Sequence, residues 1–444
     1  MKKSYSALQR RKNGANSYKV HPAWAVAAVA FVALVGAAGF RATPSVLIAP
    51  LHEEFGWSLG TISAAVSVNL LLYGLTAPFA AALMERFGIR RVIMIALVLV
   101  SAGSGLTVLM RSSWQLILCW GVLVGLGTGS MALAFVATIA GRWFVKHRGL
   151  VTGVLTAGGA AGNLIFLPLQ ARLVVSHGWR VAALTVAGTA LAVVPLVWWR
   201  LRDHPAQLGI GPLGGEYAEP KPIAPAGAAR TALRALGQAA RTRPFWLLAG
   251  GFAICGATTN GLVGTHFIPA AHDHGMPVTT AASLLALVGL FDIAGTVISG
   301  WLTDRVDSRV LLGVYYFGRG LSLLALPSLF AAGAHPSIVV FILFYGLDWV
   351  ATVPPTVTLC REYFGDRGPV VFGWVFASHQ IGAAAAASAA GLLRDQLGTY
   401  NAAWYGAGAL AVLASLLSLM LFAGKRLEPI APGIGLAPVT AVPS

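Results

Sequence analysis

Four ionisable side chains stand inside stretches of this sequence that are otherwise apolar. Asp292, Arg319, Asp348 and His379 occur in four successive apolar stretches of the second half. If these stretches are membrane-spanning helices, each side chain lies about 14–18 Å from one end, near the middle of a hydrocarbon core of about 30 Å. A charge at that depth costs at least about 2.5–3.5 kcal/mol. We therefore interpret all four as candidates for substrate binding or proton coupling.

Asp292 is the strongest candidate among them. A buried aspartate that is paired with an arginine stays ionised, whereas one without its partner can carry a proton. Our hypothesis is that Asp292 alternates between these two states, with Arg319 as its partner. The structural alternative is a static Asp292–Arg319 bridge between neighbouring helices. Asp348 is equally well interpreted as a ligand or as a packing partner of Arg319.

Arg41 and His379 each leave two interpretations open. Arg41, in the outer third of the first apolar stretch, could bind an anion with two parallel N–H groups, or extend its charge to the outer lipid headgroups. His379 titrates near neutral pH and could relay protons, or it could be a neutral hydrogen-bonding residue. Its neighbour Gln380 is expected to point in a different direction, because adjacent residues do not share a helix face.

The composition excludes an ordinary soluble protein. Of the 444 residues, 57% are hydrophobic and 10% are charged, against about 25% charged in soluble domains. Twelve apolar stretches are long enough to cross a bilayer as helices. They cover residues 23–50, 58–84, 91–110, 114–140, 149–171, 180–200, 244–270, 279–303, 310–332, 336–360, 369–393 and 401–424. The sequence therefore predicts an all-α integral membrane protein with twelve transmembrane helices.

The net charge of +16 could indicate a nucleic-acid partner, but its distribution argues against one. With the N-terminus placed in the cytoplasm, the outer segments hold only Arg111, Arg172, Arg180 and Arg394. Nearly all other Lys and Arg residues then fall in cytoplasmic segments, which is the positive-inside bias. We expect a multi-pass protein of the inner (plasma) membrane, with both termini cytoplasmic, basic segments near anionic headgroups and no nucleic-acid partner.

A repeat divides the chain into two halves. The sequence Glu85-Arg86-Phe87-Gly88-Ile89-Arg90-Arg91 has an echo at Asp304-Arg305, and Trp143-Phe144 has one at Tyr363-Phe364. Both pairs are separated by about 220 residues, so one membrane unit occurs twice. Such repeats are typical of secondary transporters. They predict two six-helix bundles that are related by a pseudo-two-fold axis.

The predicted organisation follows from this repeat. It comprises a basic N-terminal tail (1–22), an N-terminal bundle (23–200), a central loop (201–243), a C-terminal bundle (244–424) and a C-terminal tail (425–444). The end of the loop, Ala228 to Arg243, forms either an amphipathic surface helix or a disordered tether.

No cofactor or metal is expected. The three cysteines fall within apolar stretches and give no disulfide or metal pattern. The polar cluster of His266, His272, Asp273 and His274 lacks the spacing of helical metal ligands. We interpret this cluster as a solvated loop.

With these motifs in place, the chain resembles the major facilitator superfamily. The segment Glu85 to Arg91, with its echo at Asp304-Arg305, resembles the signature between helices two and three of that family. Four further motifs resemble the bacterial members of its monocarboxylate-porter and oxalate/formate-antiporter group. They are Glu54-Phe55-Gly56-Trp57-Ser58, Arg142-Trp143-Phe144-Val145-Lys146-His147-Arg148-Gly149, Asp203-His204-Pro205 with Gly209, and Ser378-His379-Gln380 with Gly382.

The resemblance implies two bundles around a central cavity that opens alternately to each side. It also implies a cytoplasmic gate made by Glu85, Arg86, Arg90, Asp304 and Arg305. An acid and an arginine at facing helix ends can form a pair that breaks when the bundles separate. The alternative is that these residues only anchor the topology.

The resemblance also assigns a role to Asp292. Monocarboxylate porters carry an aspartate at this place in helix eight and an arginine one turn later, and Thr296 stands at the arginine position here. Arg319 is a candidate replacement for that arginine. The lysine of helix one in the family corresponds to Ser45, about one turn from Arg41.

We therefore expect a monomeric secondary active transporter that works by alternating access. Its expected cargo is a small organic anion, with a monocarboxylate favoured, moved by proton symport or anion exchange. An exporter of hydrophobic or amphipathic compounds is the alternative within the transporter class. A sensor with the transporter fold and a membrane enzyme are disfavoured, because no signalling domain and no paired nucleophile and base are evident.

Overall fold

The computed structural model describes residues 21–131, 133–215, 228–331 and 337–423. The expected N-terminal and C-terminal tails lie largely outside these residues. Twelve helical spans are long and apolar enough to cross a membrane, in agreement with the predicted fold class. Their bounds are Pro22–Phe55, Leu59–Phe87, Ile89–Leu109, Ser113–Trp143, Arg148–His177, Trp179–Arg200, Arg243–Asp273, Val278–Thr303, Ser308–Leu329, Ile338–Phe364, Gly368–Leu397 and Asn401–Leu419.

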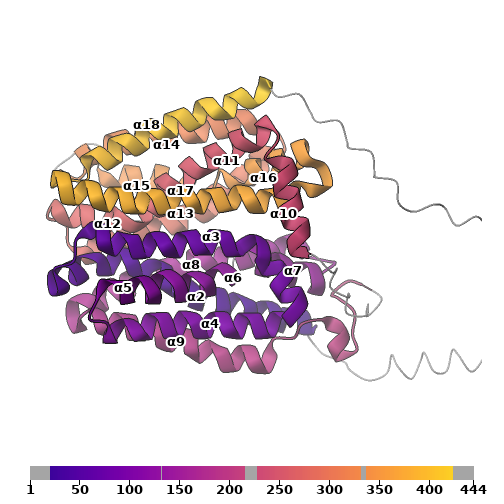
Figure 1. The fold of residues 1–444 in the computed structure, drawn as a ribbon. Helices are drawn as coiled ribbons and strands as arrows, with labels where there is room; N and C mark the ends of the chain where they lie inside the picture. The colour runs from indigo at the N-terminus through magenta and orange to yellow at the C-terminus, as the bar shows by residue number, and fades with distance from the viewer. Residues whose placement is uncertain (1–20, 132, 216–227, 332–336, 424–444) are drawn as a thin grey trace, which may run out of the picture.

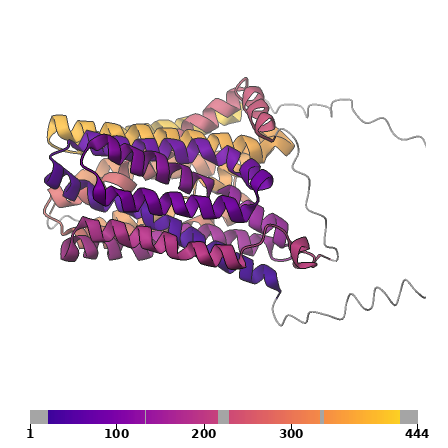
Figure 2. The ribbon, with the colours of Figure 1, turned by 60° about the horizontal axis from the view of Figure 1, so that its bottom comes forward.

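The spans form two bundles that lie side by side (Figure 1). One contains α2 (Pro22–Phe55), α3 (Leu59–Phe87), α4 (Ile89–Leu106), α5 to α7 (Ser113–Trp143), α8 (Arg148–His177) and α9 (Trp179–Arg200). The other contains α11 (Arg243–Gly256), α12 (Gly264–Asp273), α13 (Val278–Thr303), α14 (Ser308–Leu329), α15 (Ile338–Asp348), α16 (Val353–Phe364), α17 (Gly368–Leu397) and α18 (Asn401–Leu419). Figure 2 shows the helices of both bundles running lengthwise together.

The bundle has two ends, which we name by the residues found there. The proximal end holds Pro22, Phe87 and Arg200, and the distal end holds Phe55 and Leu397. At the proximal end, α10 (Ala228–Ala239) lies beside α3 and α17 and so bridges the two bundles (Figure 1). The indole N–H of Trp374 on α17 donates to the carbonyl of Ala232 at 2.9 Å. The end of the central loop is thus helical.

Local sequence explains where the first two spans end and begin. Gly56 ends α2 with a φ of 66°, a left-handed conformation that glycine adopts without a Cβ penalty. Ser58 then caps α3, because its hydroxyl accepts the N–H of Thr61 at 3.1 Å. Beside this turn, Glu54 accepts hydrogen bonds from Trp179 at 2.6 Å and from Arg180. The motif Glu54 to Ser58 is therefore a compact helix-to-helix connection.

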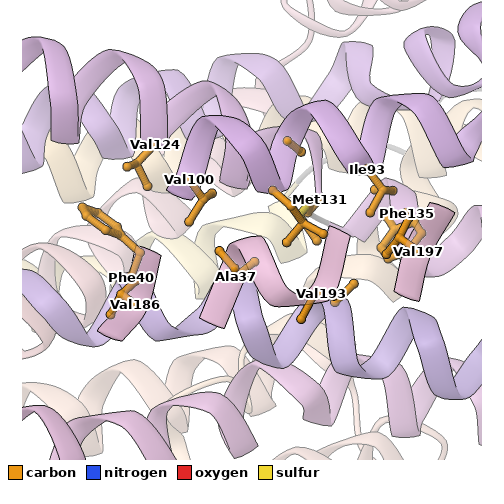
Figure 3. Close-up of a cluster of buried hydrophobic side chains, with 14 of the residues drawn as sticks. Ala37, Phe40, Ile93, Val100, Val124, Met131, Phe135, Val186, Val193 and Val197 are labelled. Atoms are coloured by element: carbon orange, nitrogen blue, oxygen red, sulfur yellow. The ribbon is translucent and has the colours of Figure 1, made fainter. Parts of the chain in front are cut away.

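The core of the N-terminal bundle is built from small and branched apolar side chains. Figure 3 shows Phe40 and Ala37 of α2 facing Val100 of α4 and Val193 of α9, all of them buried. Alanine and glycine allow these helices to approach closely, which is how helices associate where water supplies no hydrophobic driving force. Close packing is supplemented by hydrogen bonds between helices, such as those from Ser101 and Ser104 of α4 to carbonyls of α9 at 2.9 Å.

Three spans depart from a regular helix. Two of them contain π-helical stretches, Ile117–Val124 and Ala257–Val263, which are frequent at functional sites. The third, expected as one helix over 336–360, is broken between Asp348 and Val353. Pro354 and Pro355 stand directly after this break. Because proline has no backbone N–H, these residues suit the first turn of a new helix and oppose continuation of the old one.

Gly295 provides a test of the close packing beside this break. A Cβ on Gly295 of α13 would lie 1.9 Å from the carbonyl oxygen of Leu347 on α15. We expect Gly295→Ala to force the two helices apart and to destabilise the protein by about 1–3 kcal/mol. Thermal unfolding in detergent measures this loss.

Gly300 on the same helix is the matched control. A Cβ at Gly300 meets nothing within 4 Å, so Gly300→Ala should leave stability unchanged or raise it by up to about 1 kcal/mol. Equal unfolding midpoints for the two variants would show that the close approach at Gly295 does not matter.

Candidate functional site

A central cavity of about 500 Å³ lies between the two bundles. Both halves of the chain contribute to its wall, at the place where transporters with internal repeats bind their cargo. Polar lining residues include Arg41, Ser45, Asn69, Tyr73, Asn163, Thr259, Asn260, Asp292, Thr296, His379 and Gln380. Aromatic lining residues include Phe40, Phe252, Trp349 and Phe376. The cavity is therefore largely apolar, with polar groups at a few positions.

The cavity is closed toward the distal end and open toward the proximal end. Leu167 of α8 and Leu285 of α13 line it on the distal side, where both are buried in one core cluster that joins the bundles. On the proximal side the same two helices contribute Gly153 and Val297. Val297 is 68% exposed, and a Cβ on Gly153 would meet nothing within 4 Å. The two helices thus diverge toward the proximal end.

Arg41 is the cationic group of this wall. It lies on α2, lines the cavity and is exposed there. Within the described part of the chain, its guanidinium makes no ion pair and no hydrogen bond. A Cβ on Gly159 would lie 2.6 Å from its Nη2, so the glycine leaves room for the guanidinium beside α8. An unpaired guanidinium in a cavity can accept a carboxylate through two parallel N–H groups.

Asp292 is the acidic group of the wall and is not bound to Arg319. Its Oδ1 accepts the backbone N–H of Val350 at 3.0 Å and the hydroxyl of Thr296 at 3.1 Å. Among the ion pairs of the described residues, none involves Asp292. The expected Asp292–Arg319 bridge is therefore not present in this structure. Thr296, which stands where the family resemblance implied an arginine, thus donates its hydroxyl to Asp292.

Arg319 holds the broken tenth span together. It is 1% exposed, and its Nε donates to Oδ2 of Asp348 at 2.5 Å. Its Nη2 donates to the carbonyl oxygen of Asp348 at 2.7 Å, and its Nη1 contacts Sγ of Cys255 at 2.8 Å. The carbonyl at the end of α15 is thus satisfied by a side chain from α14. A backbone group freed by a helix break inside a membrane needs such a partner.

Other side chains complete the support of this break. The hydroxyl of Ser299 on α13 donates to the carbonyl of Ala351 at 2.5 Å, and Asp292 accepts from Val350 as described. Trp349 and Val350, the first residues of the break, line the central cavity. Hydrogen bonds from α13 and α14 therefore fix the position of two cavity-lining residues.

Arg319 and Asp348 border a different hollow from the one that holds Asp292. A groove of about 620 Å³ runs between α14 and α15, and both residues line it, whereas neither lines the central cavity. Leu321 and Phe344, which are exposed, form part of its wall. The structure therefore places the Arg319–Asp348 pair on the groove side of the bundle.

His379 and Gln380 both border the central cavity, contrary to the expectation that they point apart. Gln380 lies where α17 meets α3, because a Cβ on Gly74 of α3 would lie 2.5 Å from Cβ of Gln380. The ring of His379 stacks on Phe376, with 5.9 Å between centroids and 7° between planes. Its Nδ1 is buried and has no hydrogen-bond partner among the described residues.

The expected gate residues lie at the proximal ends of the spans, where the cavity is open. Glu85, Arg86 and Arg90 flank the turn between α3 and α4, and Asp304 and Arg305 follow α13. None of the five takes part in an ion pair among the residues that the structure describes.

Asp203, from the motif after the sixth span, holds the turn between α3 and α4. Its carboxylate accepts the backbone N–H of Arg90 at 2.8 Å. A Cβ on Gly88 would lie 2.8 Å from the same carboxylate. The absence of a side chain at Gly88 therefore leaves room for Asp203. Sequence reasoning did not find this helix cap.

The histidine cluster does not form one solvated loop. His266 is fully buried in α12, where its Nε2 bonds the carbonyl of Ala387 at 2.9 Å. The interpretation as a loop is therefore wrong for His266, and also for His272 and Asp273, which form the exposed end of α12. His274 lies in the exposed turn that follows. In the described ranges no group of three or more His, Cys, Asp or Glu side chains could hold a metal.

The Arg319–Asp348 pair predicts a strong dependence of stability on both partners. Arg319→Met leaves a buried carboxylate without its cation, which should lower the free energy of unfolding by about 3–5 kcal/mol. The double variant Arg319→Met with Asp348→Asn should lose less than the sum of the two single losses, because the unpaired charge is gone. Chemical unfolding of the purified protein measures the coupling.

Glu54→Gln is the control for this double-mutant cycle of Arg319 and Asp348. Glu54 forms the half-exposed pair with Arg180, and its loss should cost within about 1 kcal/mol. Additive losses in the Arg319–Asp348 cycle would show that the two side chains do not act as a pair.

Comparison with known proteins identifies the family. The sequence profile of the Major Facilitator Superfamily matches residues 29–371 and 267–435. The uncharacterized MFS-type transporter YcxA of Bacillus subtilis (strain 168) is 27% identical over 387 residues, which cover 85% of this chain and 90% of that protein. Monocarboxylate transporter 11 of Mus musculus is 28% identical over 405 residues, with 86% and 83% covered.

The fold agrees with this assignment. A structure of the inward open conformation of the xylose transporter XylE from E. coli superposes with a TM-score of 0.69 at 15% identity. It covers 91% of this chain and 97% of XylE. With twelve apolar spans in two bundles and a profile match over most of its length, this chain belongs to the Major Facilitator Superfamily.

Proposed function

We propose that this protein is a secondary active transporter of a small organic anion that carries one negative charge. The observation that carries the proposal is Arg41, an unpaired cation in the wall of the central cavity. The other deep cation, Arg319, is neutralised by Asp348 and does not reach this cavity. Among the described residues that line the cavity, Arg41 is the cation without an ion-pair partner. A free cation among aromatic side chains suits a substrate with one carboxylate and an apolar body. The similarity to monocarboxylate transporters supports the same class.

The proposed orientation places the proximal end in the cytoplasm. The basic residues Arg86, Arg90, Arg91 and Arg305 gather at that end, and cytoplasmic loops carry such an excess. The cavity, which is open there, is then inward-facing. Transport by alternating access requires a second state in which the distal end opens and the proximal end closes. Gate pairs among Glu85, Arg86, Arg90, Asp304 and Arg305 belong to that second state.

Asp292 is the proposed proton-coupling residue. It lines the cavity near the middle of the membrane, is buried and takes part in no ion pair among the described residues. Desolvation favours the protonated form of such a carboxyl group, and the arrival of a cation favours the ionised form. His379 also lines this cavity, and its buried Nδ1 has no hydrogen-bond partner among the described residues, so it is the second candidate for proton exchange.

Export of hydrophobic compounds is the second candidate function. Phe252, Trp349 and Phe376 give the cavity an aromatic wall, which also suits an uncharged cargo. The two functions differ in whether a carboxylate and Arg41 are required.

Proteoliposome uptake driven by an inward proton gradient tests the proposal. We expect saturable accumulation of one or more labelled monocarboxylates, with dicarboxylates excluded and protein-free vesicles inactive. Asp292→Asn should abolish gradient-driven accumulation, because the amide cannot carry a proton. Asp307→Asn, which changes an exposed acid at the proximal end, is the matched control and should retain uptake. Full proton-driven uptake by folded Asp292→Asn would exclude the coupling role.

Arg41 gives a separate prediction about cargo binding. Arg41→Gln should raise the KM for the transported acid by about 10- to 100-fold, because a charge-assisted hydrogen bond contributes about 1.5–3 kcal/mol. Arg41→Lys keeps the charge without the paired N–H groups. Its KM should therefore lie between those of the parent protein and Arg41→Gln. The same KM in all three proteins would show that Arg41 does not contact the carboxylate. Unaltered flux of a neutral amphipathic compound would then favour the exporter.

A further inference from the structure

Two glycines bring α3 and α17 together at the distal end, where the cavity is closed. A Cβ on Gly60 of α3 would lie 2.7 Å from the side chain of Leu392, and a Cβ on Gly391 of α17 would lie 2.6 Å from Oγ of Ser63. One turn deeper, the hydroxyl of Ser67 donates to the carbonyl of Ala384 at 2.6 Å. The two bundles are therefore in direct contact along this helix pair, and any opening of the distal end must separate it.

Asp395 adds a charged contact across the same helix pair. Its Oδ1 accepts the backbone N–H of Leu59 at 3.0 Å, and its Oδ2 accepts that of Gly60 at 2.7 Å. Leu59 and Gly60 are the first two residues of α3, so these N–H groups have no partner inside their own helix. The positive end of the helix dipole lies at the same place and favours a carboxylate.

This contact differs from the other charged contacts of the protein. The five ion pairs among the described residues each join two residues of the same bundle. Arg394, next to Asp395 in sequence, pairs with Asp273 of its own bundle at 2.7 Å. In contrast, Asp395 belongs to the C-terminal bundle and binds the N-terminal bundle. Among the described residues, Asp395 is the acid whose carboxylate binds backbone N–H groups of the other bundle at the distal end.

We propose that Asp395 is a gate residue at the distal end of this transporter. Its carboxylate stabilises the state in which the cavity is closed to the distal side, and it must release Leu59 and Gly60 before the cavity can open there. Asp395 is exposed at the rim, so water can replace both N–H groups when the helices part. The gate rests on the proposed alternating access, and it requires no assumption about the cargo.

The experiment measures access to a cysteine buried behind this contact. Ser63 is fully buried, and its hydroxyl has no partner among the described residues, so Ser63→Cys is a nearly isosteric reporter. Intact cells that express the full chain are treated with a membrane-impermeant maleimide. Labelling is compared with that of the parent chain, in which Cys119, Cys255 and Cys360 are buried. Ser63→Cys alone should label slowly.

Asp395→Asn in this background should raise the labelling rate by about tenfold, which corresponds to about 1.4 kcal/mol in the opening equilibrium. Asp273→Asn is the matched control, because it removes an acid at the same end whose partner lies in the same bundle. This control should leave the rate unchanged. An unchanged rate in Asp395→Asn, or an equal rise in the control, would overturn the proposal.

A second variant removes the donor instead of the acceptor. Leu59→Pro deletes one of the two N–H groups at the first position of α3, where proline is well tolerated, and Ser58 already has the extended conformation that a following proline requires. The labelling rate should rise by about threefold, since the N–H of Gly60 remains. An unchanged labelling rate in Leu59→Pro would likewise overturn the proposal.

The labelling result is independent of the transport assay. If no carboxylate is transported and labelling still responds to Asp395→Asn, the assigned cargo is wrong and the gate stands. If carboxylate transport is normal and labelling does not respond, only the role of Asp395 is wrong.

Discussion

The break in the tenth span is the constraint on which the cavity depends. A helix that crosses a membrane cannot leave backbone groups unpaired, because no water is present to satisfy them. Between Asp348 and Val353 this role falls to Arg319, Asp292 and Ser299 on the two preceding spans. The break turns Trp349 and Val350 toward the cavity. The same hydrogen bonds therefore hold the fold together and shape the wall of the site.

The two deep aspartates have different physical positions, although the sequence places them at similar depths. Asp348 has a dedicated cation and faces the groove between α14 and α15. Asp292 has only neutral donors and faces the central cavity. A carboxylate with a fixed partner holds its charge, whereas one with neutral donors can change its protonation state at lower cost. Because one of those donors is the N–H of Val350, a proton that arrives at Asp292 weakens a hydrogen bond that supports the helix break.

The sequence predicted the elements well, but it left the pairing of Arg319 open between Asp292 and Asp348, and the structure has the pair with Asp348. Twelve spans and two bundles follow from apolar length and the repeat, because these properties are local or periodic. The family follows from the resemblance of short motifs such as Glu85 to Arg91. The depth of a residue along its helix could also be predicted from the sequence. The direction in which its side chain points around the helix axis could not. That direction decides that Arg319 pairs with Asp348 instead of Asp292. The adjacent prolines 354 and 355 were the signal for the broken span. No comparable signal marked Asp395, whose partners are backbone groups 335 and 336 residues away.

Under the proposed function, the division of charge between the bundles gives the substrate a direct role in the transport cycle. The N-terminal bundle supplies Arg41, and the C-terminal bundle supplies Asp292 and most of the aromatic wall. A monoanion that binds Arg41 neutralises a charge that the cavity otherwise leaves unpaired, and its apolar body then favours contact with the opposite bundle. Binding therefore lowers the cost of bringing the two walls together at the proximal end. In the proposed alternating-access cycle, closure there accompanies separation at the distal end, where α3 and α17 are in contact. The free energy of the contacts between these two helices then opposes the transition that substrate binding favours.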